Sequence, residues 1–121
     1  MNKKKTLVIG ASTNPARYSY LAIHKLLIHQ HPVVALGNKK GLVNNIEIAT
    51  APQPFDGVDT VTLYINSTLQ KQYYTYIIGL NPKRIIFNPG TENDELENLA
   101  SQKGIATLEA CTLVLLSTGQ Y

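Results

Sequence analysis

The sequence predicts an α/β protein with a single Rossmann-like, doubly wound parallel sheet of about five strands and helices on both faces. Short apolar runs alternate along the chain with longer segments of helical periodicity, which is the pattern of βαβ units. The length of 121 residues suits one domain with its own core. No internal repeat or linker is visible, so we expect one domain over residues 1–121.

Three predicted strands and one helix make up the first half of the chain. The apolar run Thr6–Gly10 is typical of a strand that is buried on both faces. Apolar residues recur on one helical face over Tyr20–Gln30, and Pro32 ends that helix. A second buried strand follows at Val33–Gly37. The long loop after it contains a short strand at Ile46–Ala49.

The second half continues the alternation. The remaining predicted strands are Thr60–Ile65, Arg84–Asn88 and Ile105–Ala110. A helix capped by Ser67 or Thr68 is expected to run to about Leu80. Thr91 is the expected N-cap of the next helix, and Gly104 ends it. A short helix over residues 111–119 completes the fold.

Composition and charge exclude several function classes. The net charge of +3 equals the contribution of Lys3, Lys4 and Lys5, and no basic stripe with interleaved aromatic residues indicates nucleic-acid binding. No run approaches the roughly 20 apolar residues that span a bilayer. The single cysteine, Cys111, excludes an internal disulfide and fits a reducing compartment, so we expect a cytoplasmic protein.

Catalytic and metal-binding patterns are not apparent in the sequence. His24 and His29 are five positions apart, which does not align them on one helix face for a metal. The acidic residues after Thr91 are typical of a solvated helix start, and Cys111 has no obvious activating partner. We therefore expect a binding protein without evident catalysis and without a metal.

Polar residues follow the first strand and lead into the first helix. Free backbone N–H groups at such a turn bind anions, and Arg17 adds a side chain that pairs with a phosphate at two points. The loop has neither the Lys-Ser/Thr of a Walker A motif nor the three glycines of a dinucleotide fingerprint. Its candidate ligand residues are Gly10, Ala11, Ser12, Asn14, Pro15, Arg17, Tyr18 and Ser19, with Ser19 also the candidate N-cap.

Basic residues follow the second strand, where NAD-binding sheets place an acidic residue for the ribose hydroxyls. The candidate ligand residues here are Gly37, Asn38, Lys39 and Lys40. A pair of lysines suits a phosphate on the ribose. NADP offers one at the 2′ position and coenzyme A offers one at the 3′ position.

Two further strand ends belong to the same predicted edge of the sheet, because ligands bind beyond the carboxyl ends of parallel strands. The third main strand contributes Tyr64, Ile65 and Asn66. The fourth contributes the tight turn of Asn88, Pro89 and Gly90.

In this order, "VIGASTNPARYSYLAIHKLL", "LYINS", "FNPGTEN" and "IATLEACT" resemble the CoA-binding domain family, which is similar to the N-terminal domain of the succinyl-CoA synthetase alpha subunit. The resemblance implies that the first loop holds the pyrophosphate and that Lys39 or Lys40 lies near the 3′-phosphate. It also implies that Tyr64 and Ile65 lie beside the adenine, and that residues 88–90 lie on the pantetheine side.

Two departures from the family pattern stand out. The second strand lacks the usual proline at its end, and the loop after it is short. The chain also lacks the synthetase's second domain with its phosphorylated histidine, so the ligase activity is not implied.

The expected function is binding of coenzyme A or an acyl-CoA, a small-molecule nucleotide ligand. One alternative is an NADP-dependent oxidoreductase-type domain, which explains the basic turn but not the missing glycines. Another is an interaction module with a degenerate nucleotide site. A homo-oligomer is possible through Tyr73, Tyr74 and Tyr76, although these tyrosines are equally suited to packing their helix on the sheet.

Overall fold

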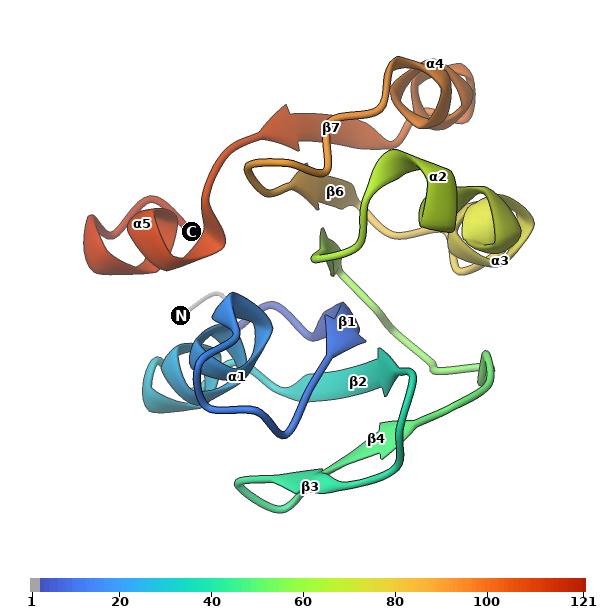
Figure 1. Ribbon diagram of the computed structural model, residues 1–121. Helices are drawn as coiled ribbons and strands as arrows, with labels where there is room; N and C mark the ends of the chain where they lie inside the picture. Colours follow the sequence, from blue (N-terminus) through green and yellow to red (C-terminus); the bar gives the residue numbers. More distant parts are fainter. Residues whose placement is uncertain (1–2) are drawn as a thin grey trace.

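Strand β1 (Thr6–Ala11) lies at the centre of a seven-stranded sheet in the computed structural model, which describes residues 3–121 (Figure 1). The strand order is β3-β4-β2-β1-β5-β6-β7. The other strands are β2 (Val33–Gly37), β3 (Leu42–Val43), β4 (Ile46–Ala49), β5 (Thr60–Leu63), β6 (Arg84–Phe87) and β7 (Ala106–Glu109). Leu7, Val8 and Ile9 are all buried, because helices cover both faces of β1.

The helices divide between the two faces of the sheet, as Figure 1 shows. One face is covered by α1 (Tyr18–Ile28) and α5 (Thr112–Ser117). The other is covered by α2 (Ser67–Gln70), the 3-10 helix η1 (Lys71–Tyr73), α3 (Tyr74–Gly79) and α4 (Asp94–Gln102). Each face has its own core: Val8 packs with Ile23 and Leu26 on the α1 side, while Leu7 packs with Ile77 and Leu96 on the other.

The predicted fold class is confirmed, with seven strands in place of about five. The additional short strand β3 pairs antiparallel with β4, the short strand that was expected. Asn44 and Asn45 form the turn between them with positive φ angles of 49° and 69°. Two consecutive residues of this kind favour the tight turn of a hairpin, so the Asn-Asn pair was the available signal for β3.

Helices α2 and α4 each begin with an asparagine cap, so the caps predicted at Ser67 or Thr68 and at Thr91 are wrong. The Asn66 side chain accepts a hydrogen bond from the Leu69 amide at 2.9 Å. The Asn93 side chain accepts one from the Leu96 amide at 3.2 Å. An asparagine one or two residues from a serine or threonine competes with it for the N-cap position. In both α2 and α4 the asparagine is the N-cap.

The segment expected as one long helix is divided into α2, η1 and α3. Tyr73, Tyr74 and Tyr76 within it are packed against the core, which agrees with the packing alternative for these tyrosines. At the start of α1, the cap position is Arg17 and not Ser19, which is buried in the first turn. No helix in residues 3–121 has the length and apolar character needed to cross a membrane.

The order in which successive strands are added to the sheet reverses at β1. After β1 the chain passes through α1 to β2 on one side, and β5 later pairs with β1 on the other side. A crevice at the carboxyl end of β1 is the expected ligand position in a sheet with this topology. The return connection over residues 50–59 contains no helix, which leaves part of β2 and β4 without a covering layer.

Candidate functional site

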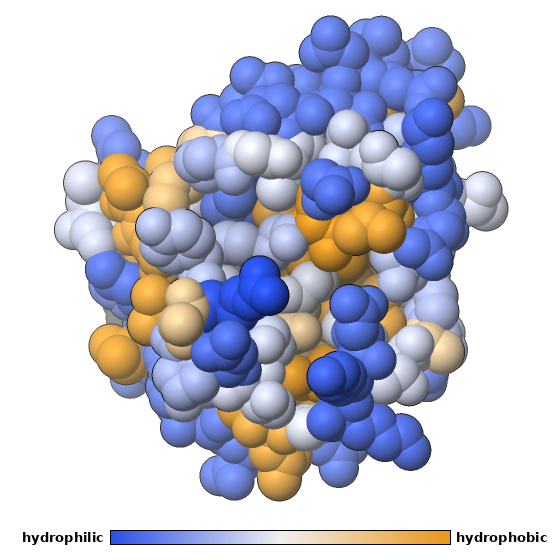
Figure 2. Space-filling model, viewed as in Figure 1, coloured by the Kyte–Doolittle hydropathy of each residue, from blue (hydrophilic) through white to orange (hydrophobic). Residues whose placement is uncertain are grey.

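A cleft of about 760 Å³ lies at the carboxyl ends of β1, β2, β5 and β6. The space-filling view shows a hollow in the middle of this face, with hydrophilic and apolar surface side by side (Figure 2). The predicted site residues that line the cleft are Gly10, Ala11, Ser12, Asn14, Arg17, Tyr18, Ser19, Gly37, Asn38, Lys39, Tyr64, Ile65, Asn66, Pro89 and Gly90. Pro15, Lys40 and Asn88 do not line it.

The loop after β1 holds its own shape through short side chains. The Ser12 hydroxyl accepts a hydrogen bond from the Asn14 amide at 3.0 Å, and the Asn14 carboxamide accepts one from the Ala16 amide at 3.0 Å. Within residues 3–121, the amides of Tyr18 and Ser19 at the start of α1 have no acceptor. The helix has 11 residues, so these amides are the positive end of a substantial helix dipole.

Gly10 allows the end of β1 and the segment after β5 to approach each other closely. Its φ of +93° lies in the left-handed region. A Cβ atom at this position would lie 2.9 Å from the backbone carbon and oxygen of Tyr64. The sequence predicts Gly10 as a ligand residue of this loop. The structure adds the backbone of Tyr64 as the group that the missing side chain accommodates.

The first loop also packs directly against the lysine turn. A side chain at Gly41 would collide with the methyl group of Thr13, which lines the cleft. Gly37, at the end of β2, faces the carbonyl of Ala11 in the same way. The two loops that sequence analysis identified separately therefore form one continuous wall.

Arg17 and Lys39 bring unpaired positive charge to this wall. Both side chains are exposed and line the cleft. The structure gives neither of them a hydrogen bond or ion pair within residues 3–121. Cations without protein partners, next to free helix amides, make this half of the cleft suited to an anion.

Tyr64 forms part of the floor and is turned toward the core below α1. Burial raises the pKa of its phenol far above the ordinary value. Burial disfavours the phenolate form, so Tyr64 is not suited to general base catalysis.

Asn88 braces the structure behind the cleft. Its side-chain amide donates to the Thr62 hydroxyl at 2.7 Å and to the Leu63 carbonyl at 2.9 Å. Its side-chain oxygen accepts from the Thr112 amide at 2.8 Å. The buried carboxamide is fully engaged, so Asn88 joins β5, β6 and α5, and it does not line the cleft.

Gln70 is fully buried and ties two edges of the cleft together. Its amide nitrogen donates to the Ile65 carbonyl at 2.9 Å and to the Thr91 carbonyl at 2.7 Å. Its oxygen accepts from the Asn93 side chain at 2.9 Å. This role of Gln70 is not apparent from the sequence, because a glutamine in a short polar segment is ordinarily solvated.

Six residues that sequence analysis did not propose also line the cleft: Ile9, Thr13, Leu36, Leu69, Tyr73 and Thr91. Leu69 and Tyr73 project from α2 and η1, directly after the third predicted strand end. Ile65, Leu69 and Tyr73 are spaced by four positions in the sequence. Residues four apart lie on the same face of a helix, so this spacing was the sequence signal that they belong together.

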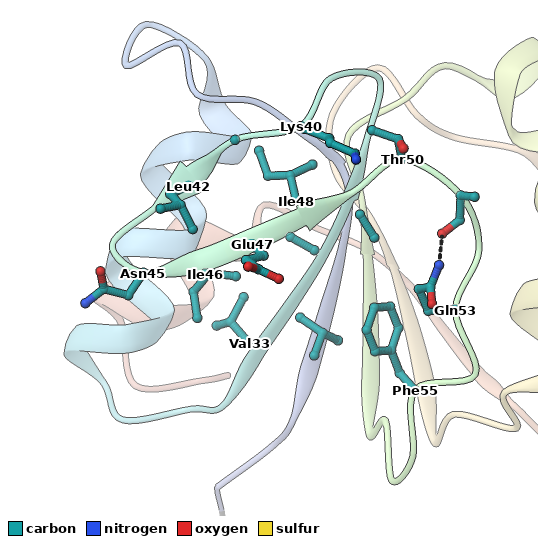
Figure 3. Close-up of a pocket in the computed structure, with 15 residues that line it drawn as sticks. Val33, Lys40, Leu42, Asn45, Ile46, Glu47, Ile48, Thr50, Gln53 and Phe55 are labelled. Atoms are coloured by element: carbon teal, nitrogen blue, oxygen red, sulfur yellow. Dashed lines mark hydrogen bonds between the residues drawn. The ribbon is translucent and has the colours of Figure 1, made fainter.

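A second hollow of about 960 Å³ runs along β2, β3 and β4 (Figure 3). It lies where no helix covers the sheet, and its lining is largely aliphatic, with Phe55 and Glu47. Lys40 lies here, on the other side of the turn from Lys39. This hollow flanks the strands and does not lie at the topological switch point, so we do not assign the nucleotide site to it.

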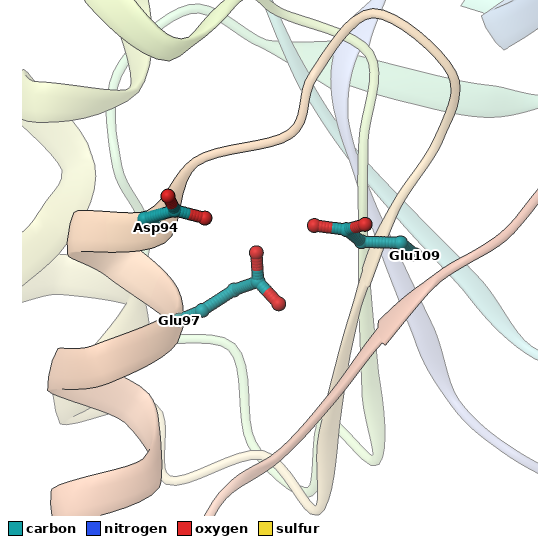
Figure 4. Close-up of side chains that lie close together, drawn as sticks. All are labelled: Asp94, Glu97 and Glu109. Carbon is teal, nitrogen blue, oxygen red and sulfur yellow. The ribbon is translucent and has the colours of Figure 1, made fainter.

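Three carboxylates come together away from the cleft (Figure 4). Asp94 and Glu97 from α4 and Glu109 from β7 each place an oxygen within 4.8 Å of the others. Partial burial, a hydrogen bond with Glu109 and repulsion from the neighbouring carboxylates raise the pKa of Glu97 to about 7. The solvated helix start that the sequence predicted therefore includes one carboxyl that is reluctant to ionise.

We expect Glu97→Gln to stabilise the protein at pH 8 and to have little effect at pH 4.5. Between these values the folded protein retains a proton that the unfolded chain releases, so wild-type stability falls as pH rises through the interval. Because the site is partly solvated, the gain at pH 8 is on the order of 1 kcal/mol. Urea unfolding at both pH values measures it. Glu47→Gln, an equal charge change on β4, is the control, and an equal gain there would contradict the explanation.

Comparison with known proteins gives both a family and a fold. The family model of the CoA binding domain matches residues 4–117. No curated protein matches the chain. A crystal structure described as that of an uncharacterized protein is 49% identical, covers 100% of both chains and has a TM-score of 0.97.

More distant structures show the same fold. A hypothetical protein from Pyrococcus horikoshii is 24% identical over 97% of this chain and 84% of that chain, with a TM-score of 0.87. A protein from Thermus thermophilus is 17% identical over 98% and 91% of the two chains, with a TM-score of 0.83. Because the family model extends over almost all of the sequence, the chain belongs to the CoA-binding domain family.

Proposed function

We propose that the cleft binds coenzyme A or an acyl-CoA. The observation that carries the proposal is the pairing of unpartnered Arg17 and Lys39 with the free amides at the start of α1, all in one cleft of a chain that belongs to this family. A ligand with several phosphates supplies the negative charge and the hydrogen-bond acceptors that these groups do not find in the protein. No acid–base pair is part of the proposal, so the function is binding.

The strand order suggests how the phosphates divide. The loop after β1 and the start of α1 are suited to the pyrophosphate. Lys39 follows β2, which pairs with β1, and is therefore placed beside that loop for a phosphate on the ribose. We propose Lys39 for this role and not Lys40, because Lys40 lines the other hollow.

Calorimetric titration with coenzyme A, NADP and ATP tests the proposal. We expect coenzyme A to bind most tightly and to raise the melting temperature as its concentration increases. Binding of NADP without binding of coenzyme A would instead support a dinucleotide-dependent domain. Binding of none of the three would support the interaction-module alternative.

The lysine assignment makes a separate prediction. Lys39→Ala should weaken coenzyme A binding about 10-fold, the loss of one charged hydrogen bond of roughly 1.5 kcal/mol. Its affinity for dephospho-CoA, which lacks the 3′-phosphate, should change less than threefold. Lys40→Ala is the matched control and should resemble the wild type with both ligands. Equal losses for the two ligands would place Lys39 away from the 3′-phosphate.

A further inference from the structure

One wall of the cleft is apolar and has no role in phosphate binding. Ile65 follows β5, and Leu69 and Tyr73 project from α2 and η1 into the same space. Leu69 is 46% exposed. Apolar surface lies in the hollow of Figure 2 beside the position that α2 occupies in Figure 1. An exposed leucine inside a cleft indicates a contact with a ligand more strongly than an exposed leucine on a convex surface does.

The apolar wall, defined as Ile65, Leu69 and Tyr73, is held in place from below. Gln70 lies between Leu69 and Tyr73 in the chain and points inward, where it bonds to the carbonyls of Ile65 and Thr91. Buried hydrogen bonds of this kind fix the backbone on both sides of the cleft. The backbone that carries the apolar wall is therefore held in position before a ligand binds.

The order of the strands determines which part of the ligand reaches this wall. The pyrophosphate loop follows β1, Lys39 follows β2 on one side of it, and the apolar wall follows β5 on the other side. In coenzyme A the ribose with its 3′-phosphate lies at one end of the pyrophosphate and the thiol-bearing arm at the other. A ribose placed toward Lys39 directs the arm toward the wall.

From this placement, which rests on the proposed function, we propose that the apolar wall binds the acyl group of an acyl-CoA, so that the ligand class is acyl-CoA with an aliphatic acyl chain. Ile65 then contacts the acyl-bearing arm and not the adenine, the position that the family resemblance implied. Ile65 lies beside the pyrophosphate loop, with its Cγ2 atom 3.0 Å from the position of a Cβ at Gly10, so the arm of free coenzyme A passes this residue first. An aliphatic acyl chain that folds back onto Leu69 and Tyr73 adds apolar contact that free coenzyme A lacks. The difference is the hydrophobic contribution of the chain.

A series of ligands of increasing acyl length tests this. Calorimetry compares free coenzyme A with acetyl-, butyryl- and hexanoyl-CoA. We expect affinity to rise about two- to fourfold for each added methylene, as for apolar groups that become buried. Leu69→Ser should remove most of the ratio between hexanoyl-CoA and free coenzyme A. Leu21→Ser, at an exposed leucine of α1 outside the cleft, is the control and should keep the ratio.

The outcomes separate this inference from the proposed function. If free coenzyme A binds and all acyl-CoAs bind equally well, the acyl subsite is wrong while the proposed function stands. If the ratio persists in Leu69→Ser, the acyl group lies elsewhere and the inference is again overturned. If neither free coenzyme A nor any acyl-CoA binds, both proposals fail.

Discussion

Replacing Gly10 with alanine should destabilise the protein by about 2–4 kcal/mol, more than the same change at Gly57 or Gly79. Two costs combine at this position. The φ of +93° is unfavourable for a residue with a Cβ atom, and that atom would lie 2.9 Å from the backbone of Tyr64. Relief of the collision requires the end of β1 and the segment after β5 to separate. Thermal and urea unfolding measure the loss, which corresponds to a melting-temperature decrease on the order of 10 °C.

The two other glycines separate these costs. Gly57 has a φ of +66° but no atom within 4 Å of an added Cβ, so Gly57→Ala should lose only the conformational contribution of about 1 kcal/mol. Gly79, in α3, also has open space and shows no positive φ, so Gly79→Ala should be neutral or stabilising. A loss at Gly10 no larger than that at Gly57 would show that the two strand ends adapt without cost.

The central strands β1, β2, β5 and β6 were predictable because they consist mainly of apolar and β-branched residues that are almost all buried. Val33–Gly37 and Ile46–Ala49 have the predicted bounds, and the others differ by one or two residues at their ends. Helix starts were less predictable, because several polar residues near each start are capable of capping. Which one does so depends on the direction in which the chain leaves the preceding strand, and that direction is a tertiary property.

In the candidate site, too, the sequence predicted which residues lie near one another but not the direction in which each side chain points. Sequence reasoning placed the loops after β1, β2, β5 and β6 at one edge, and the cleft is there. It did not separate Lys39 from Lys40, because consecutive residues in a turn point in different directions. Asn88 is polar and at a strand end, yet it points inward to brace the sheet. Gln70 and Leu69 belong to a four-residue helix, which is too short for a periodicity that would show which one faces inward.

Replacing Arg17 with alanine should reduce the affinity for coenzyme A about 10- to 100-fold while leaving stability almost unchanged. The side chain makes no hydrogen bond or ion pair within residues 3–121, so folding does not depend on it. A charged hydrogen bond to a phosphate contributes roughly 1.5–3 kcal/mol, which gives the expected change. Calorimetry measures the affinity, and thermal unfolding without ligand measures the stability.

Arg17→Lys and Lys103→Ala make this prediction specific. Lysine keeps the charge but loses the planar, two-point geometry of the guanidinium, so Arg17→Lys should recover only part of the affinity. Lys103, at the end of α4, is an exposed cation outside the cleft, and Lys103→Ala removes the same charge. If Lys103→Ala weakens binding as much as Arg17→Ala, the effect comes from the net charge of the protein. If only Arg17→Ala does so, and Arg17→Lys is intermediate, then the start of α1 is the anion-binding part of the cleft.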